Sequence, residues 1–194
     1  MGPSDRKEKR GRSMKLAKPR VDIGLATHAL ELMLSFWRNE AGVPFDHLLK
    51  IRRGHDQYRH DANGSVLKIN HHADPLPKTP ASGYRQLVIA RPGVTTPRDL
   101  RDPDGNSLRL VPPGFGGVDQ IGIRLAVRDL ARHRRFYAEA LGLPEAETDG
   151  ETAFRAGESL IFMTESPDAV GDAGMAGSRP GQPEPRPSSG NGRR

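Results

Sequence analysis

In four segments of the sequence polar side chains alternate with apolar ones, and these polar residues could together form a binding site. Successive side chains of a β-strand point to opposite faces, so each segment has one apolar face and one face free for polar groups. A hollow surface with a few convergent polar groups is what a small-molecule site requires. The candidate ligand-binding residues on the polar faces are Asp22, Lys68, Asn70, Tyr84, Gln86 and Arg109.

The charged members of this set suggest a chemistry. Asp22 with Arg109 or Lys68 could hold an anionic or oxygen-rich ligand, because a guanidinium donates two parallel hydrogen bonds to a carboxylate. Alternatively, these charges form an ion pair with only a structural role, since buried charges are usually paired whatever the function. Both interpretations stay open, and no catalytic residue can be assigned.

Histidines raise the question of a metal site. His55 and His60 fall on opposite faces of one expected strand, as do His71 and His72, so neither pair can chelate one ion without a bulge. Each could still join a partner on a neighbouring strand, but we expect solvated or hydrogen-bonded histidines. The sequence has no cysteine, which excludes thiolate metal sites and cysteine nucleophiles. It also lacks the serine-hydrolase and phosphate-loop motifs.

The net charge of +6 lies at the ends of the chain. The first 20 residues supply +6 and residues 166–194 supply +1, so the body carries −1. A nucleic-acid-binding domain should have its positive charge on a folded face, so we expect no nucleic-acid partner. We also expect no membrane partner and a cytoplasmic location, because no apolar run approaches the ~20 residues of a membrane helix and no signal peptide is evident.

Hydrophobic periodicity predicts two successive units. In the first, Asn63-Gly64 is typical of a hairpin turn, and the Asp102–Asn106 turn precedes the last strand. The strands expected there are Val21–Thr27, His55–Asp61, Ser65–His71, Tyr84–Arg91 and Ser107–Val111, with a helix over His28–Ala41. The second unit has expected strands at Gln120–Val127, Phe154–Ala156 and Ser159–Thr164, with a helix from an Asp129 N-cap to Leu141.

The two units repeat one order of elements. GLATHALELMLSFWRNEAGVP in the first corresponds to RLAVRDLARHRRFYAEALGLP in the second, about 100 residues later. With RDPDGNSLRL, this order resembles the vicinal oxygen chelate superfamily, the glyoxalase, bleomycin-resistance and extradiol-dioxygenase group; HDQYRHDANGSVLKIN is similar to a two-domain bacterial subgroup. The resemblance implies an α+β fold in which paired βαβββ modules form a curved-sheet cup, with the second domain incomplete.

The resemblance also implies a domain division. We expect a disordered basic leader at 1–17, a first glyoxalase-like domain at 18–114, a partial second one at 118–165 and a disordered tail at 166–194. The tail is rich in Gly, Pro, Ser and Arg, and the second unit stops after about half of what the first contains. On this expectation the chain is C-terminally truncated.

The family's metal-ligand places fall on poor donors here. In the first unit they are Asp22, Lys68, Tyr84 and Arg109, and in the second Gly122, with Gln120 on the same face, and Phe162. Only Asp22 is a plausible ligand. We therefore expect no cofactor in this chain, although Fe, Mn, Ni or Zn would be possible in full-length relatives.

The function that the resemblance implies is the binding of a small polar molecule in the cup. The alternatives are a metal-dependent dioxygenase or a lyase or isomerase, or an inactive truncated fragment of one. The expected partners are a small-molecule ligand and, through open strand edges, a second copy in a homodimer.

Overall fold

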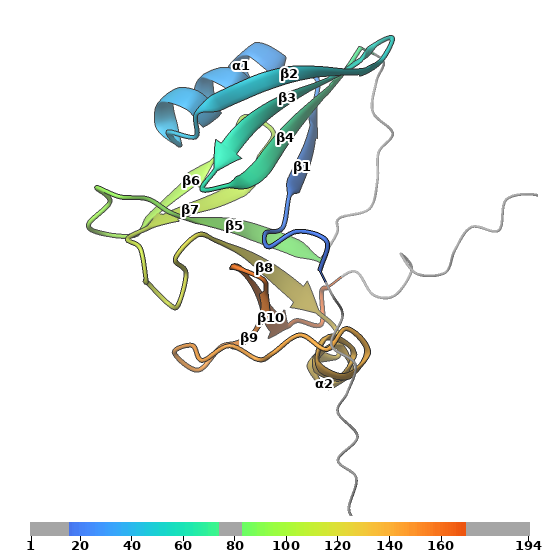
Figure 1. The fold of residues 1–194 in the computed structure, drawn as a ribbon, viewed down its shortest axis with the longest axis vertical. Helices are drawn as coiled ribbons and strands as arrows, with labels where there is room; N and C mark the ends of the chain where they lie inside the picture. The colour runs from blue at the N-terminus through green and yellow to red at the C-terminus, as the bar shows by residue number, and fades with distance from the viewer. Residues whose placement is uncertain (1–15, 74–82, 170–194) are drawn as a thin grey trace, which may run out of the picture.

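Two β-sheets make up most of the protein in a computed structural model that describes residues 16–73 and 83–169. The first sheet has the order β1 (Ile23–Thr27), β4 (Ser65–His72), β3 (His55–Ala62), β2 (Phe45–Arg52). The second has the order β6 (Arg98–Arg101), β7 (Ser107–Val111), β5 (Tyr84–Ala90), β8 (Ile121–Val127), β10 (Ser159–Glu165), β9 (Thr152–Ala156). The expected α+β class is confirmed, and Figure 1 shows the first sheet above the second.

One strand motif occurs three times in these sheets. Its first strand pairs in parallel with its last strand, and the last strand pairs antiparallel with the one before it. β1, β3 and β4 form the motif in the first sheet, while β5, β6 and β7 and then β8, β9 and β10 form it in the second. The second sheet is continuous because β5 and β8, the first strands of their motifs, pair antiparallel. This pairing joins strands from both sides of the expected boundary between residues 114 and 118.

The two helices follow the sequence repeat. α1 (Leu30–Ser35) continues into a π-helical turn over Phe36–Glu40, and α2 (Leu130–Arg135) continues into one over Phe136–Ala140. The side chain of Asp129 accepts a hydrogen bond of 2.7 Å from the Arg132 amide, as expected for an N-cap. Each helical segment is followed by a glycine at positive φ, 66° at Gly42 and 62° at Gly142.

The main core lies between the first sheet, α1 and one face of β5 and β7. Met33 and Trp37 of α1 and its π-helical turn pack in one cluster with Leu67 and Ile69 of β4 and with Leu87 of β5. A second cluster lies under α2, where Leu143, Phe154 and Met163 are buried. A third, smaller cluster on the opposite face of the second sheet includes Val88, Val111 and Phe162.

Two strands were not expected from the sequence. β2 (Phe45–Arg52) has irregular register at two places, between Phe45 and His47 and between Lys50 and Arg52, so its side chains do not alternate. β6 (Arg98–Arg101) is short and mostly charged. Both are sheet edges, where the apolar pattern of a buried strand is not required.

Most of the expected leader and tail lies outside the described residues. Of the tail predicted from residue 166, the structure describes Ser166–Ala169, and Ala169 is fully buried. Within the described part of the chain, neither helix has the length and apolar composition that crossing a bilayer demands.

A buried carboxamide joins the two sheets. Gln120, just before β8, donates to the carbonyls of Ala62 and Asn63 at 3.2 and 3.0 Å and to the Ser65 hydroxyl at 2.6 Å. Its own oxygen accepts from the Ser159 hydroxyl at 2.8 Å, and Ser159 is fully buried. The tip of the β3–β4 hairpin is thereby tied to β8 and β10.

Replacing this carboxamide tests its contribution to stability. Gln120→Leu leaves two carbonyls and two hydroxyls without their partner, so we expect the free energy of unfolding to fall by roughly 2–4 kcal/mol. Urea titration followed by circular dichroism measures the change. Gln57→Leu, which removes one part-buried hydrogen bond to Asn70, serves as the control and should lose less than about 1 kcal/mol. Equal losses in the two variants would contradict the role of Gln120.

Candidate functional site

The six candidate ligand-binding residues do not share one surface. Asp22, Lys68 and Asn70 lie in or beside the first sheet, whereas Gln86 and Arg109 lie in the second. Tyr84 packs against the main core. The expected cluster of Asp22 with Arg109 is therefore wrong, because strand alternation assigns a face within a sheet but does not say which strands share that sheet.

Asp22 is the centre of a local charge cluster. Its carboxylate contacts the Nζ atoms of Lys18 at 2.7 Å and of Lys68 at 2.9 Å, and it accepts from the Val66 amide at 3.2 Å. Burial raises the pKa of Asp22, but these hydrogen bonds outweigh burial and lower it to about 2. The ion-pair interpretation thus has a concrete geometry with Lys68 as the partner.

Tyr84 was assigned to the wrong face. The register of β5 on β8 shifts between Tyr84, which pairs with Leu125, and Gln86, which pairs with Arg124. The extra residue reverses the direction of Tyr84, whose ring enters the core and whose hydroxyl donates to the Ser107 carbonyl at 3.4 Å. Burial, with a contribution from the Asp102 carboxylate, raises the pKa of Tyr84 to about 12. Tyr84 is a structural residue.

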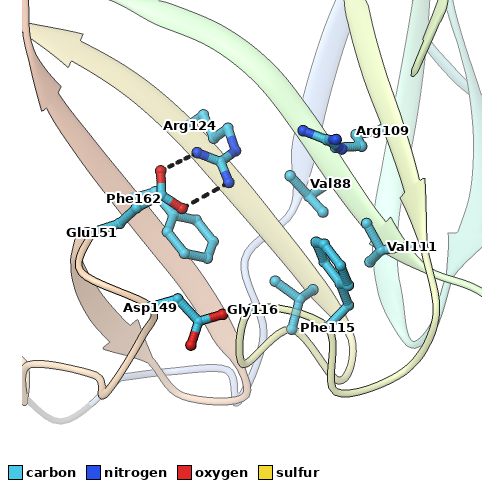
Figure 2. A pocket seen from close by; sticks show the side chains of 10 residues that line it. Val88, Arg109, Val111, Phe115, Gly116, Arg124, Asp149, Glu151 and Phe162 are labelled. Atoms are coloured by element: carbon cyan, nitrogen blue, oxygen red, sulfur yellow. Dashed lines mark hydrogen bonds and ion pairs between the residues drawn. The ribbon is translucent and has the colours of Figure 1, made fainter. Parts of the chain in front are cut away.

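A cavity of about 80 Å³ opens on the face of the second sheet that α2 does not cover. Figure 2 shows its side chains converging from β5, β7, β8 and β10 and from two loops. The apolar part of the wall is Val88, Val111, Phe115, Val118 and Phe162, and the charged part is Arg109, Arg124, Asp149 and Glu151.

Arg124 is held on one side of the cavity. Its two terminal nitrogens donate to the two carboxylate oxygens of Glu151, one of them at 2.9 Å. Its guanidinium also lies over the Phe162 ring, 4.8 Å from the ring centre. With a bidentate partner and an aromatic face, Arg124 is a fixed wall of the cavity rather than a free anchor.

Arg109 is held much more loosely across the cavity. Its Nε atom is buried and has no hydrogen-bond partner among the described residues, and the nearest carboxylate oxygen, on Asp99, is 3.7 Å away. Asp99 accepts instead from Gln86, at 3.0 Å. A guanidinium with five N–H donors and so few acceptors can bind an oxygen-rich group.

The sequence did not reveal Arg124, Phe115, Asp149 or Glu151 as wall residues. Arg124 stands 100 positions after Gly24 in the repeat, so the pattern matched it to a small residue. The other three lie in loops, whose paths periodicity does not predict. Phe162, by contrast, was named in the sequence analysis, as the residue at the inner-strand place that the family resemblance implies.

Two of the histidines stack on each other. His55 and His72 are opposite each other on β3 and β4, and their rings stack with centres 4.1 Å apart. His60, on the other face, is fully buried, and burial lowers its pKa. Among the described residues, no group of three or more His, Asp or Glu side chains could hold a metal ion.

The cavity itself does not fit a metal. The inner-strand place is occupied by Phe162, and Gly122 beside it has no side chain; a Cβ there would lie 2.8 Å from the phenyl ring. Two arginines oppose a cation, and Glu151 is already bound to Arg124.

No protein-family model and no curated protein sequence matches the chain.

Two solved structures share the architecture of this chain. A glyoxalase I mutant from Zea mays superposes with a TM-score of 0.61 at 13% identity, over 77% of this chain and 69% of that one. A protein from Bacillus subtilis, provisionally named a dioxygenase, gives a TM-score of 0.56 at 12% identity, over 85% of this chain and 66% of that one. The chain thus spans about two thirds of the length of these structures.

The pKa of Asp22 predicts a pH dependence of stability. Because its folded pKa of about 2 lies below its ordinary value of 3.8, its stabilising effect is present above pH 4 and is lost as the pH falls through 2. We expect Asp22→Asn to lower the free energy of unfolding by about 1–2 kcal/mol at pH 7, and the difference from wild type to vanish near pH 2. Urea titrations at several pH values measure it, with exposed Asp119→Asn as the control. A difference independent of pH would contradict the ion pair.

The poor metal ligands of the cavity predict that the purified protein contains little bound metal. Tag-free protein purified without chelator should carry well under one equivalent of Fe, Mn, Ni or Zn, measured by elemental analysis. Stoichiometric metal that survives dialysis would show that donors beyond those in the cavity bind it.

Proposed function

We propose that this chain, which has the vicinal oxygen chelate fold, binds a small carboxylate-bearing molecule in the cavity over its second sheet. The observation that carries the proposal is Arg109, a guanidinium at the cavity wall whose buried Nε atom has no hydrogen-bond partner among the described residues. A buried, unsatisfied donor of this kind is unfavourable alone and is stabilised by a ligand oxygen.

The wall supports a ligand with both a charged and an apolar part. Val88 and Phe162 form the apolar floor on β5 and β10, and Phe115 stands beside them with 47% of its surface exposed. An apolar ligand group would cover this surface while its carboxylate meets Arg109. Small-molecule sites commonly combine apolar walls with a few placed polar groups in this way.

The cavity size restricts the ligand. A volume of about 80 Å³ suits a molecule of few atoms, or the carboxylate end of a larger molecule that extends outward. Asp149, exposed at the rim, could accept a hydrogen bond from a hydroxyl or amine of such a molecule. We keep the cytoplasm as the expected location of this binding.

Binding without a metal is favoured over metal-dependent catalysis. Glyoxalase- or dioxygenase-like chemistry would need carboxylate or imidazole ligands around one ion, and the cavity offers arginines, a phenyl ring and a glycine instead. Fold alone does not decide chemistry, since one fold can hold unrelated sites. We therefore base the proposed function on the side chains that line this cavity rather than on the likeness to enzymes of the same fold.

Carboxylate probes test this function. Acetate, lactate and benzoate, titrated by NMR or calorimetry, should bind, and benzamide should not, because it lacks the charge. Arg109→Gln should weaken carboxylate binding by roughly tenfold or more, as expected for loss of a hydrogen bond to a charged group. Arg98→Gln, an exposed arginine of β6, should leave binding unchanged. Failure of all three carboxylates to bind would instead favour an inactive fragment.

A further inference from the structure

The turn between β3 and β4 contains a chemically reactive pair of residues. Asn63 and Gly64 form this turn at positive φ, 56° and 83°, as in a type I′ hairpin. In an Asn-Gly sequence the backbone nitrogen of the glycine can attack the side-chain amide of the asparagine, because glycine has no Cβ to hinder the approach. The sequence contains one other such pair, Asn191-Gly192, outside the described residues.

This reaction, deamidation, replaces the side-chain amide by a carboxylate. The Gly64 nitrogen loses its proton and forms a bond to Cγ of Asn63, while Nδ2 takes up a proton and leaves as ammonia. Water then opens the cyclic imide at either of its carbonyl groups. The products are aspartate and isoaspartate, and in isoaspartate the main chain runs through the former side chain. Water is the only co-reactant.

In the folded chain both reacting groups of this pair form hydrogen bonds elsewhere. Nδ2 of Asn63 donates across the junction of the two sheets to the Ala90 carbonyl at 2.6 Å and to the Gln120 carbonyl at 3.1 Å. The Gly64 amide donates to the Asp61 carboxylate at 2.5 Å. For the attack the Asn63 side chain must turn back over its own backbone, which breaks both hydrogen bonds to the second sheet. Deamidation therefore requires the hairpin tip to separate from the second sheet first.

The Gln120 side chain strengthens this closed arrangement. It donates to the carbonyls of Ala62 and Asn63 on one side of the turn and to the Ser65 hydroxyl on the other. Ala62 and Ser65 are buried, so the tip separates only when several hydrogen bonds and a packed contact break together. A reaction that needs such a local opening is slowed by the rarity of the open state.

We propose that Asn63 is a deamidation site that the junction between the sheets keeps closed, and that deamidation releases the hairpin tip from the second sheet irreversibly. A carboxylate oxygen in place of Nδ2 is an acceptor that faces the Ala90 and Gln120 carbonyls, where a donor is needed. A carboxylate without a donor in this part-buried place is unfavourable, so the tip does not return. Isoaspartate also adds a methylene group to the main chain, which does not fit the tight turn.

Deamidation rates test the closed state. In full-length protein kept in neutral buffer, Asn63 should react roughly tenfold or more slowly than in a synthetic peptide of residues 60–68, measured by mass spectrometry that separates asparagine, aspartate and isoaspartate. Gln120→Leu should raise the rate at Asn63 several-fold. Ser65→Ala removes a single hydrogen bond of the same network and should raise the rate less. Circular dichroism verifies that each variant is folded.

Two controls separate local opening from unfolding of the whole chain. Gln57→Leu removes a hydrogen bond to Asn70 away from the turn and should leave the rate at Asn63 unchanged. In concentrated urea, Asn63 of every variant should react at the rate of the peptide. Asn191 in the same samples is the internal reference for that unfolded rate.

An aspartate variant tests the consequence of the reaction. Asn63→Asp should raise the unfolding equilibrium constant roughly tenfold to a hundredfold at neutral pH, because the new carboxylate loses two hydrogen bonds and faces two carbonyls. Amide hydrogen exchange should become faster at the β3–β4 turn. Asn39→Asp, at an exposed position after α1, is the matched control and should change the constant less than roughly threefold.

Three results would overturn the proposal. The first is that Asn63 in folded wild type reacts as fast as in the peptide, which would mean that its contacts do not protect it. The second is that Gln57→Leu and Gln120→Leu raise the rate equally, which would place the controlling step in global unfolding. The third is that Asn63→Asp is as stable as wild type with unchanged exchange at the turn, which would mean that the product leaves the junction intact.

Discussion

The Gln120 carboxamide, buried where the two sheets meet, is the constraint on which the arrangement of the protein depends. It spans from β8 to the β3–β4 hairpin, and Asn63 at that hairpin tip returns hydrogen bonds to the Ala90 and Gln120 carbonyls at 2.6 and 3.1 Å. Buried amide groups of this kind are stable only in the one geometry that satisfies them all. The network therefore fixes how the first sheet stands on the second, and with it which faces stay open.

The absence of a helix between β5 and β6 explains why the sheets pack together at all. β1 and β8 are each followed by a helix that covers one face of their motif, whereas residues 91–97 connect β5 directly to β6. The face of β5 and β7 that no helix of their own motif covers presents Leu87, Ile89 and Leu108. Each is almost fully buried because α1 and β4 pack against this face instead. α1 thus covers one face of two motifs, and the cavity lies on the opposite face of the second sheet.

Strand alternation predicted local structure well and assembly poorly. Hydrophobic periodicity predicted both helices, and Asn63-Gly64 predicted the hairpin. Strand alternation placed Lys68 and Asn70 correctly on the less buried face of β4. Strand alternation failed where one extra residue enters a strand, as at Tyr84, because a β-bulge reverses the face that a period of two predicts. It also could not say that Asp22 and Arg109 belong to different sheets, since sheet order depends on contacts between segments far apart in sequence.

Phe162 has a consequence for the chemistry of the cavity. It lies where the family resemblance implies a donor atom, and its ring lies under Arg124, which in turn binds Glu151. A carboxylate or imidazole at position 162 would remove the phenyl ring that Arg124 lies over, and it would leave the charge of Arg124 beside the new metal ligand. Several residues would have to change together before a cation could bind. Phe162, Arg124 and Glu151 are thus a coupled unit, and Arg109, which has no such carboxylate partner, is the group of the wall that favours an oxygen-rich ligand.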